Sequence, residues 1–127
     1  MSLLPPYARF LGISTRRSDG GELQFVMPFG DAVVGRPGYL HGGAIAGLLE
    51  FAAFGAPYEA LGSHEAKVKP VNVTVQYMRG GIQHDTSASA VVTRLGKRVA
   101  NVEAHAWQLD RARPIAAAQL NILLRRA

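Results

Sequence analysis

The stretch "YLHGGAIAGLLEFAAFGAPY", residues 39–58, decides the fold and carries an anomaly. From Gly42 through Tyr58 its 17 residues are almost all apolar or small, yet one carboxylate, Glu50, lies in the middle. The stretch is longer than a typical strand, is rich in Ala and Leu, and lacks an alternation of period two. These features predict a helix of roughly 15–20 residues.

The expected helix begins at the pair Gly42 and Gly43, and Pro57 and Gly62 are expected to end it. Because it is apolar on all sides, it must be enclosed by other elements.

After this helix the pattern predicts strands. Residues 71–78, "VNVTVQYM", alternate strictly, which is typical of a half-buried strand with its valines and Tyr77 on one face. Residues 86–110 indicate two strands that turn near residues 95–97. Residues 114–126 indicate a last strand, although their alanines would suit a helix equally well.

The segments before the helix complete the fold. A strand is expected at residues 22–28, and residues 7–14 fit a short strand or a helical turn. We therefore predict an α+β fold in which an antiparallel sheet wraps around a central buried helix, as one domain over residues 1–127.

Composition narrows the class of protein. The formal net charge of +5 is distributed along the chain and would favour an anionic small ligand or a nucleic acid without distinguishing them. The absence of cysteine removes disulfides, thiolate metal sites and a Cys nucleophile. The N-terminus does not resemble a secretory signal, and the longest apolar run is borderline for a bilayer, so we expect a cytoplasmic protein with no membrane partner.

Several catalytic motifs are missing from the sequence. It contains no G-x-S-x-G, P-loop or G-x-G-x-x-G motif, and its four histidines form no H-E-x-x-H or H-x-x-x-H pair. Serine hydrolase, nucleotide-binding and zinc chemistry are therefore disfavoured, and no metal is expected.

Glu50 has two interpretations. It could leave the core at a helix end or pair with an arginine, or it could be an acid held in a dry cleft, where its environment tunes it as a base or nucleophile. Its position near the middle of the helix favours the second.

The segment His41-Gly42-Gly43 also has two interpretations. The glycines could simply allow tight packing, with Gly43 and Gly47 giving one smooth face against the sheet. Alternatively, the N–H groups and positive dipole end of the helix N-terminus could bind a developing oxyanion.

The spacing between the two features carries a further prediction. Gly42 and Glu50 lie eight positions apart, which is about 12 Å along a helix, so they cannot grip one carbonyl group from the same chain. If they cooperate, Glu50 of one subunit must face Gly42 of another, which predicts an obligate dimer with two equivalent sites.

These residues resemble a known family. "GYLHGGAIAGLLEFA" is similar to the HGG-then-acid segment of hotdog-fold acyl-CoA thioesterases, in the branch of the phenylacetate-pathway enzymes and one type of 4-hydroxybenzoyl-CoA thioesterase. The acid of that motif lies nine positions after its His, as Glu50 does after His41. "VTVQYMRGG" and "ASAVVTRLGKRVANVEAHAWQ" resemble the strands that follow, so the likeness covers about 110 of the 127 residues.

The resemblance implies a fold, an assembly and an activity. It implies a homodimer with a continuous sheet, commonly doubled to a homotetramer, that hydrolyses acyl-CoA thioesters without a cofactor. In these terms the Gly42 N–H would polarise the thioester carbonyl, His41 would orient the loop or the leaving sulfur, and Glu50 would act as general base or as nucleophile.

Other residues are candidates for binding the substrate. Arg94, Lys97 and Arg98 flank the expected turn near residue 96 and could meet the phosphates of coenzyme A, with Arg79 as a second candidate, or all four could be solvated. The cations are not interleaved with exposed aromatic residues, so no nucleic acid is expected. Three aromatic residues indicate an acyl pocket or simply core: Phe51, Phe54 and Tyr58.

Three positions depart from the family pattern. Gly35 replaces an Asn or Gln, Phe54 replaces a hydroxyl residue, and Pro70 replaces a Ser, and each loss removes a side chain that could position water or the thioester. Two alternatives to a thioesterase therefore stay open. One is a catalytically silent hotdog module that binds acyl-CoA, and the other is a hotdog dehydratase acting on acyl thioesters.

Overall fold

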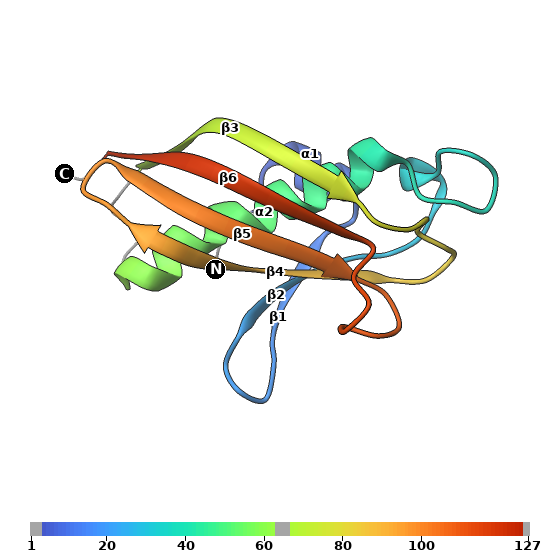
Figure 1. The fold of residues 1–127 in the computed structure, drawn as a ribbon. Coiled ribbons are helices and arrows are strands. Elements are labelled where there is room, and N and C mark those ends of the chain that lie inside the picture. Colours follow the sequence, from blue (N-terminus) through green and yellow to red (C-terminus); the bar gives the residue numbers. More distant parts are fainter. Residues whose placement is uncertain (1–3, 63–66, 126–127) are drawn as a thin grey trace.

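A long helix, α2, runs along one side of a six-stranded antiparallel sheet (Figure 1). The computed structural model describes residues 4–62 and 67–125. The elements are α1 (Pro6–Phe10), β1 (Ser14–Arg17), β2 (Leu23–Met27), the 3-10 turn η1 (Asp31–Val33), α2 (Gly42–Leu61), β3 (Lys67–Tyr77), β4 (Thr86–Leu95), β5 (Val99–Trp107) and β6 (Ala116–Arg125). Each strand expected from the sequence is present, and residues 114–126 contribute a strand rather than a helix.

The strands follow the order β1-β2-β4-β5-β6-β3. The last three strands of the chain form a meander, whereas β3 pairs with β6 and lies at the edge of the sheet. The prediction that residues 71–78 are half-buried is therefore wrong for the single chain, since Val71 and Val73 are 61% and 37% exposed. A bulge between Pro70 and Asn72 also interrupts the alternation at Val71.

Helix α2 has a clear cap at each end. His41 accepts a hydrogen bond from the backbone N–H of Gly43 at the N-terminus, and Gly62 ends the helix with a φ of 65°, a left-handed conformation that favours glycine. The expectation that Pro57 helps to end the helix is wrong. Pro57 lies inside the last turns and is buried, so core packing compensates for the one hydrogen bond that its missing N–H cannot make.

The core lies between α2 and the inner face of the sheet. On β5, Val102, Ala104 and Ala106 are buried against the helix while the residues between them face outward, as the alternation predicts. The inner face is unusually rich in small side chains, which bring the helix close to the sheet: Ala88, Ala100, Ala104, Ala106, Ala116 and Ala118. Larger residues of the helix, Leu48 and Leu49, fill the space above this alanine floor.

The helix is not enclosed on all sides in the single chain, contrary to the prediction. A row that faces away from the sheet remains open, with Gly43 exposed and Ala46, Glu50 and Phe54 half-buried. The sheet covers only one side of a cylinder, and α1 covers only part of the other. Next to α1 lies Gly47, where an added Cβ would come within 3.1 Å of the Tyr7 ring, so Gly43 and Gly47 do not form one smooth face against the sheet.

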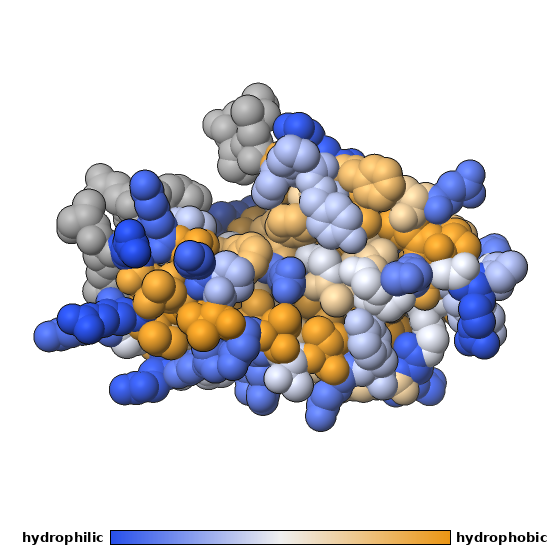
Figure 2. All heavy atoms as spheres, turned by 90° about the horizontal axis from the view of Figure 1, so that it is seen from above, coloured by the Kyte–Doolittle hydropathy of each residue, from blue (hydrophilic) through white to orange (hydrophobic). Residues whose placement is uncertain are grey.

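The surface of the single chain also carries exposed apolar side chains. Figure 2, which views the molecule from above, shows apolar side chains across the middle of this face and hydrophilic side chains at its ends. Exposed apolar residues of β3 and its continuation include Val71, Val73, Tyr77 and Met78. A long edge strand with exposed apolar side chains is a surface that proteins normally cover.

Candidate active site

The candidate site begins at the N-terminus of α2. The backbone N–H of His41 donates to the carbonyl of Val33 at 2.7 Å, which ties the segment before the helix to the 3-10 turn. The His41 ring turns back over the helix start, and its Nδ1 accepts from the Gly43 N–H at 2.8 Å. His41 therefore shapes the first turn of the helix, and its proposed role towards a substrate remains a prediction.

The backbone N–H of Gly42 is a hydrogen-bond donor that has no partner among the described residues. The His41 carbonyl accepts from the N–H groups of Ala44 and Ile45, and the His41 side chain holds Gly43, but no acceptor among the described residues binds the Gly42 N–H. This N–H lies at the positive end of the α2 dipole. It is therefore the group of the first turn that is available for an oxyanion.

Glu50 lies on the open row of the same helix. Its side chain is half-buried, and across residues 4–62 and 67–125 it forms no hydrogen bond or ion pair. Since α2 is continuous from Gly42 to Leu61, the backbone at Glu50 lies about 12 Å from that of Gly42. Within the described part of the chain, α2 therefore presents a donor and a carboxylate that have no partner and that it does not bring together.

The three aromatic candidates follow Glu50 along the helix. Phe51 and Phe54 contact each other edge to face, with ring centroids 6.4 Å apart, and Tyr7 of α1 lies 6.2 Å from Phe51. Both phenylalanines are partly buried against the core, and Tyr58 is half-buried. They line the open side of α2, and their assignment to an acyl pocket stays a prediction.

The structure separates the four candidate cations. Arg94, Lys97 and Arg98 are exposed around the turn between β4 and β5. Arg79 follows the end of β3 at the other end of the sheet, where its Nε donates to the carbonyl of Pro114 at 3.1 Å. The reason is topological, because β3 runs away from the β4–β5 turn, so one chain cannot direct all four cations at the same phosphate group.

Two of the departures from the family pattern have structural explanations. An added Cβ at Gly35 would lie 3.0 Å from the His41 Cα, so a side chain there would push on the residue that caps α2. Pro70 comes directly before the β3 bulge and is exposed. Phe54 is part of the open row described above.

The sequence reasoning missed Tyr77, which was treated only as an apolar residue of a strand. Its hydroxyl donates to the Gly42 carbonyl at 2.9 Å, from the last residue of β3. The signal that could have found it is a hydroxyl-bearing residue at the end of a strand that follows the helix.

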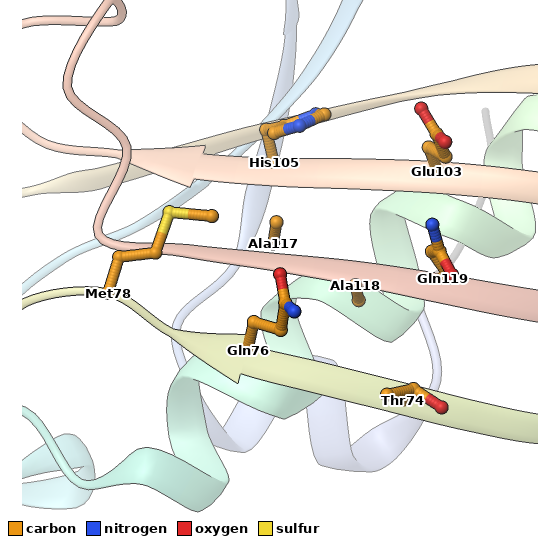
Figure 3. Close-up of a pocket in the computed structure, with 8 residues that line it drawn as sticks. All are labelled: Thr74, Gln76, Met78, Glu103, His105, Ala117, Ala118 and Gln119. Carbon is orange, nitrogen blue, oxygen red and sulfur yellow. The ribbon is translucent and has the colours of Figure 1, made fainter.

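A hollow lies on the outer face of the sheet, away from α2 (Figure 3). Its walls are Thr74, Gln76, Met78, Glu103, His105, Ala117, Ala118 and Gln119. It contains none of His41, Gly42 and Glu50, so the helix N-terminus remains the better candidate for catalysis. No group of three His, Cys, Asp or Glu residues within residues 4–62 and 67–125 could hold a metal ion.

A charged network stabilises the outer side of the sheet. Arg111 makes two hydrogen bonds of 2.7 Å to the carboxylate of Glu22, and its guanidinium lies 4.4 Å from the Trp107 ring centroid. The hydrogen bond from Arg111 is the main reason why the pKa of Glu22 is lowered to about 2, and the same pair raises the pKa of Arg111. These groups hold the residue before β2 against the loop before β6.

Comparison with known proteins identifies the class. The sheet wrapped along one long helix is a hotdog fold, and solved structures share it closely. A Bacillus halodurans protein solved with CoA has a TM-score of 0.84 at 18% identity, over 98% of this chain and 81% of that one. A phenylacetic acid degradation-related protein from Ralstonia eutropha has a TM-score of 0.79 at 22% identity, over 96% and 92% of the two chains.

The family follows from the sequence comparisons. The model of the thioesterase superfamily matches residues 37–115. A Chromobacterium violaceum protein of known structure is 34% identical over 94% of this chain and 83% of its own, with a TM-score of 0.75. The chain belongs to the thioesterase superfamily, which supports thioester hydrolysis as its general activity. No curated protein matches the sequence.

Proposed function

We propose that this protein hydrolyses acyl-CoA thioesters in a site shared between two subunits. The proposal rests on two groups of α2, a backbone N–H and a carboxylate, each of which supplies half of a hydrolytic site. The Gly42 N–H has no acceptor among the described residues, and Glu50 has no partner there, yet they are too far apart to meet within one chain. Two α2 helices placed antiparallel about a two-fold axis would bring each donor to the other chain's carboxylate.

The free edge of β3 supports this assembly. Among the described strands its backbone pairs with β6 alone, and its exposed valines are apolar. Pairing with β3 of a second copy would satisfy the edge and cover these side chains, giving a continuous sheet across a homodimer. Two such dimers would form the homotetramer expected from the family resemblance.

The chemistry follows from the two halves. The Gly42 N–H would donate to the thioester carbonyl oxygen and stabilise the negative charge that develops there. As a general base, Glu50 would take a proton from an attacking water and pass it to the sulfur as the C–S bond breaks, so that CoA leaves as a thiol and the acid is released. As a nucleophile, Glu50 would attack the carbonyl carbon and form an acyl-Glu50 anhydride while CoA leaves as a thiolate that takes a proton from water, and a second water would then hydrolyse the anhydride. His41 would contribute by holding the first turn of the helix in place.

Coenzyme A as the leaving group is supported by charge and by a relative. Arg94, Lys97 and Arg98 cluster at the end of the sheet away from their own Gly42, which in an antiparallel dimer is the end nearer to the partner's site. Arg79 would contribute from the chain that supplies Gly42. The related Bacillus halodurans protein was solved with CoA, in agreement with a nucleotide-bearing substrate. We retain a cytoplasmic location and an aromatic or bulky acyl group as parts of the proposal.

A silent acyl-CoA-binding module is the second candidate. It is favoured by the close contact of Gly35 with His41 and by the apolar Phe54 one turn after the acid, because neither position can help to orient water. It would bind the same substrate without turnover.

Thiol release separates the two candidates. Free thiol is measured from short, medium, long and aromatic acyl-CoAs with the parent protein, with Glu50→Ala and with Glu103→Gln as the control. Glu103 is also half-buried but lies on the outer face of the sheet. We expect turnover by the parent and the control and a loss of about 100-fold or more in Glu50→Ala. No thiol release above background from any substrate, with acyl-CoA binding intact, would establish the silent module.

A further inference from the structure

Tyr77 connects the sheet edge to the start of α2. Its hydroxyl donates to the Gly42 carbonyl at 2.9 Å, and its ring lies 3.4 Å from the position that a Cβ would occupy on Gly42. The residue is 55% exposed, so neither its ring nor its hydroxyl is placed there by burial in the core.

The hydrogen bond acts on a peptide group that a second side chain also holds. The Gly42 carbonyl and the Gly43 N–H belong to the same peptide unit, and that N–H donates to His41 Nδ1 at 2.8 Å. Tyr77 and His41 therefore grip the two polar ends of the Gly42–Gly43 peptide from opposite sides. Such an arrangement fixes the rotation of the unit about the chain axis.

Fixing this unit matters because it lies between two glycines. Glycine restricts its own dihedral angles less than any other residue, so a Gly-Gly pair at a helix start needs external contacts to hold one orientation. The free Gly42 N–H belongs to the preceding peptide, whose carbonyl, that of His41, accepts from Ala44 and Ile45. Because the His41–Gly42 and Gly42–Gly43 peptides are both held by hydrogen bonds, the Gly42 N–H points in one fixed direction.

Stability of the fold alone does not account for the Tyr77 contact. The Gly42 carbonyl is in the first turn of α2, where the N–H four residues later already binds it. In the single chain Tyr77 is exposed, and water there can replace the tyrosine hydroxyl at small net cost. The contact therefore has more effect on the direction of the peptide than on the stability of the protein.

We propose that Tyr77 is a positioning residue, whose hydroxyl holds the Gly42–Gly43 peptide so that the Gly42 N–H points at the thioester carbonyl. The proposal rests on the acyl-CoA hydrolysis proposed above. It assigns to the end of the edge strand a role in the reaction, exerted through Gly42 and not through contact with the substrate.

The test removes one oxygen atom. Tyr77→Phe keeps the ring against Gly42 and loses only the hydrogen bond, and Tyr39→Phe is the matched control, an exposed tyrosine at the same end of the molecule. We expect kcat of Tyr77→Phe to fall about 10-fold, less than the loss of an oxyanion donor itself, with KM changed by less than about 2-fold. Tyr39→Phe should match the parent.

Two further measurements exclude a purely structural role. A trifluoromethyl ketone analogue of the best acyl-CoA, which forms a tetrahedral adduct or hydrate, should bind Tyr77→Phe more weakly by the same factor as kcat/KM falls. A thioether analogue without the carbonyl should bind both proteins equally. Amide exchange of Gly43 should be about 5-fold faster in Tyr77→Phe, because the carbonyl of its peptide then keeps only the bond within the helix.

Each outcome decides the proposal. If the parent hydrolyses acyl-CoA and Tyr77→Phe retains its kcat, the positioning role is wrong while the proposed function stands. Equal losses for the ketone and thioether analogues would likewise overturn it, because they indicate a general change in binding. If the parent releases no thiol, the proposed function has failed and the positioning role fails with it, whatever the Gly43 exchange shows about the anchoring of the peptide.

Discussion

Two inactive chains should restore activity to each other if the site is shared. One chain carries Glu50→Ala and lacks the carboxylate, and the other carries Gly42→Pro and lacks the free N–H. The proline is compatible with the fold, because Gly42 is the first residue of α2 and its φ is not positive. His41 before it has φ −71° and ψ 134°, the extended conformation that a residue preceding proline prefers.

The size of the recovery follows from counting sites. Each variant alone should lose about 100-fold or more in kcat, because it removes one of the two groups that act on the carbonyl. A mixed site is intact when Gly42 comes from the Glu50→Ala chain and Glu50 from the Gly42→Pro chain. With equal amounts and random assortment this holds for about a quarter of all sites, in dimers and tetramers alike.

The assay measures activity in the whole mixture of co-expressed chains, which carry two different tags, and a portion purified through both tags in succession confirms that mixed oligomers form. Gly42→Ala serves as the control for the proline, since it adds a Cβ 3.4 Å from the Tyr77 ring but keeps the N–H. It should stay within a few-fold of the parent. Mixed oligomers that remain as inactive as the separate variants would refute a site built from Gly42 of one chain and Glu50 of another.

Three more predictions concern the edge, the charges and the acid stability. Val73→Lys should place a charge on the exposed edge strand β3, convert the protein to monomers in sedimentation velocity and abolish thiol release, whereas Val91→Lys, on an exposed position of β4, should leave the assembly intact. Lys97→Glu should raise KM for an acyl-CoA about 5-fold or more at low salt and leave the N-acetylcysteamine thioester of the same acid unaffected, because only the former carries phosphates. An equal effect on both thioesters would contradict a phosphate contact. Glu22 has a folded pKa lowered to about 2 from 4.5, so its pairing stabilises the protein above pH 4.5 and is lost as the pH falls through 2. Arg111→Met should therefore lower the free energy of unfolding at pH 7 by about 1 kcal/mol, a figure reduced for the solvent exposure of the pair, and the difference from the parent should shrink between pH 4.5 and 2 in urea titrations. A difference that is constant over this range would show that Arg111 acts through its packing on Trp107.

The sequence allowed the elements to be predicted because their patterns are local. A period-two alternation marked the strands, and the long apolar stretch marked α2 to within a residue at Gly42 and Gly62. Pro57 was misjudged because tertiary packing can outweigh the loss of one helical hydrogen bond. The exposure of β3 was misjudged because alternation shows which face is apolar and not which strand lies at the edge.

The site was predicted less completely, for reasons of topology. His41, Gly42 and Glu50 belong to one helix, so their spacing could be read directly. Arg79 and the cations of the β4–β5 turn are separated by the direction of β3, which depends on its pairing with β6 across the sheet. Tyr77 and Gly42 are 35 positions apart in the sequence, so no local pattern predicts their contact.

Helix α2 has one side packed on the alanine floor of the sheet and an opposite side that faces away from the sheet. One side, with Leu48 and Leu49, meets the small side chains of the sheet and carries the stability of the protomer. The opposite side carries Ala46, which is half-buried, and Phe54, which packs only partly against the core. A mutant library that varies Ala46 freely and Phe54 only among large apolar residues should therefore change the acyl groups that the protein accepts while most of its members still fold, which makes this chain a scaffold for selecting new thioester specificities.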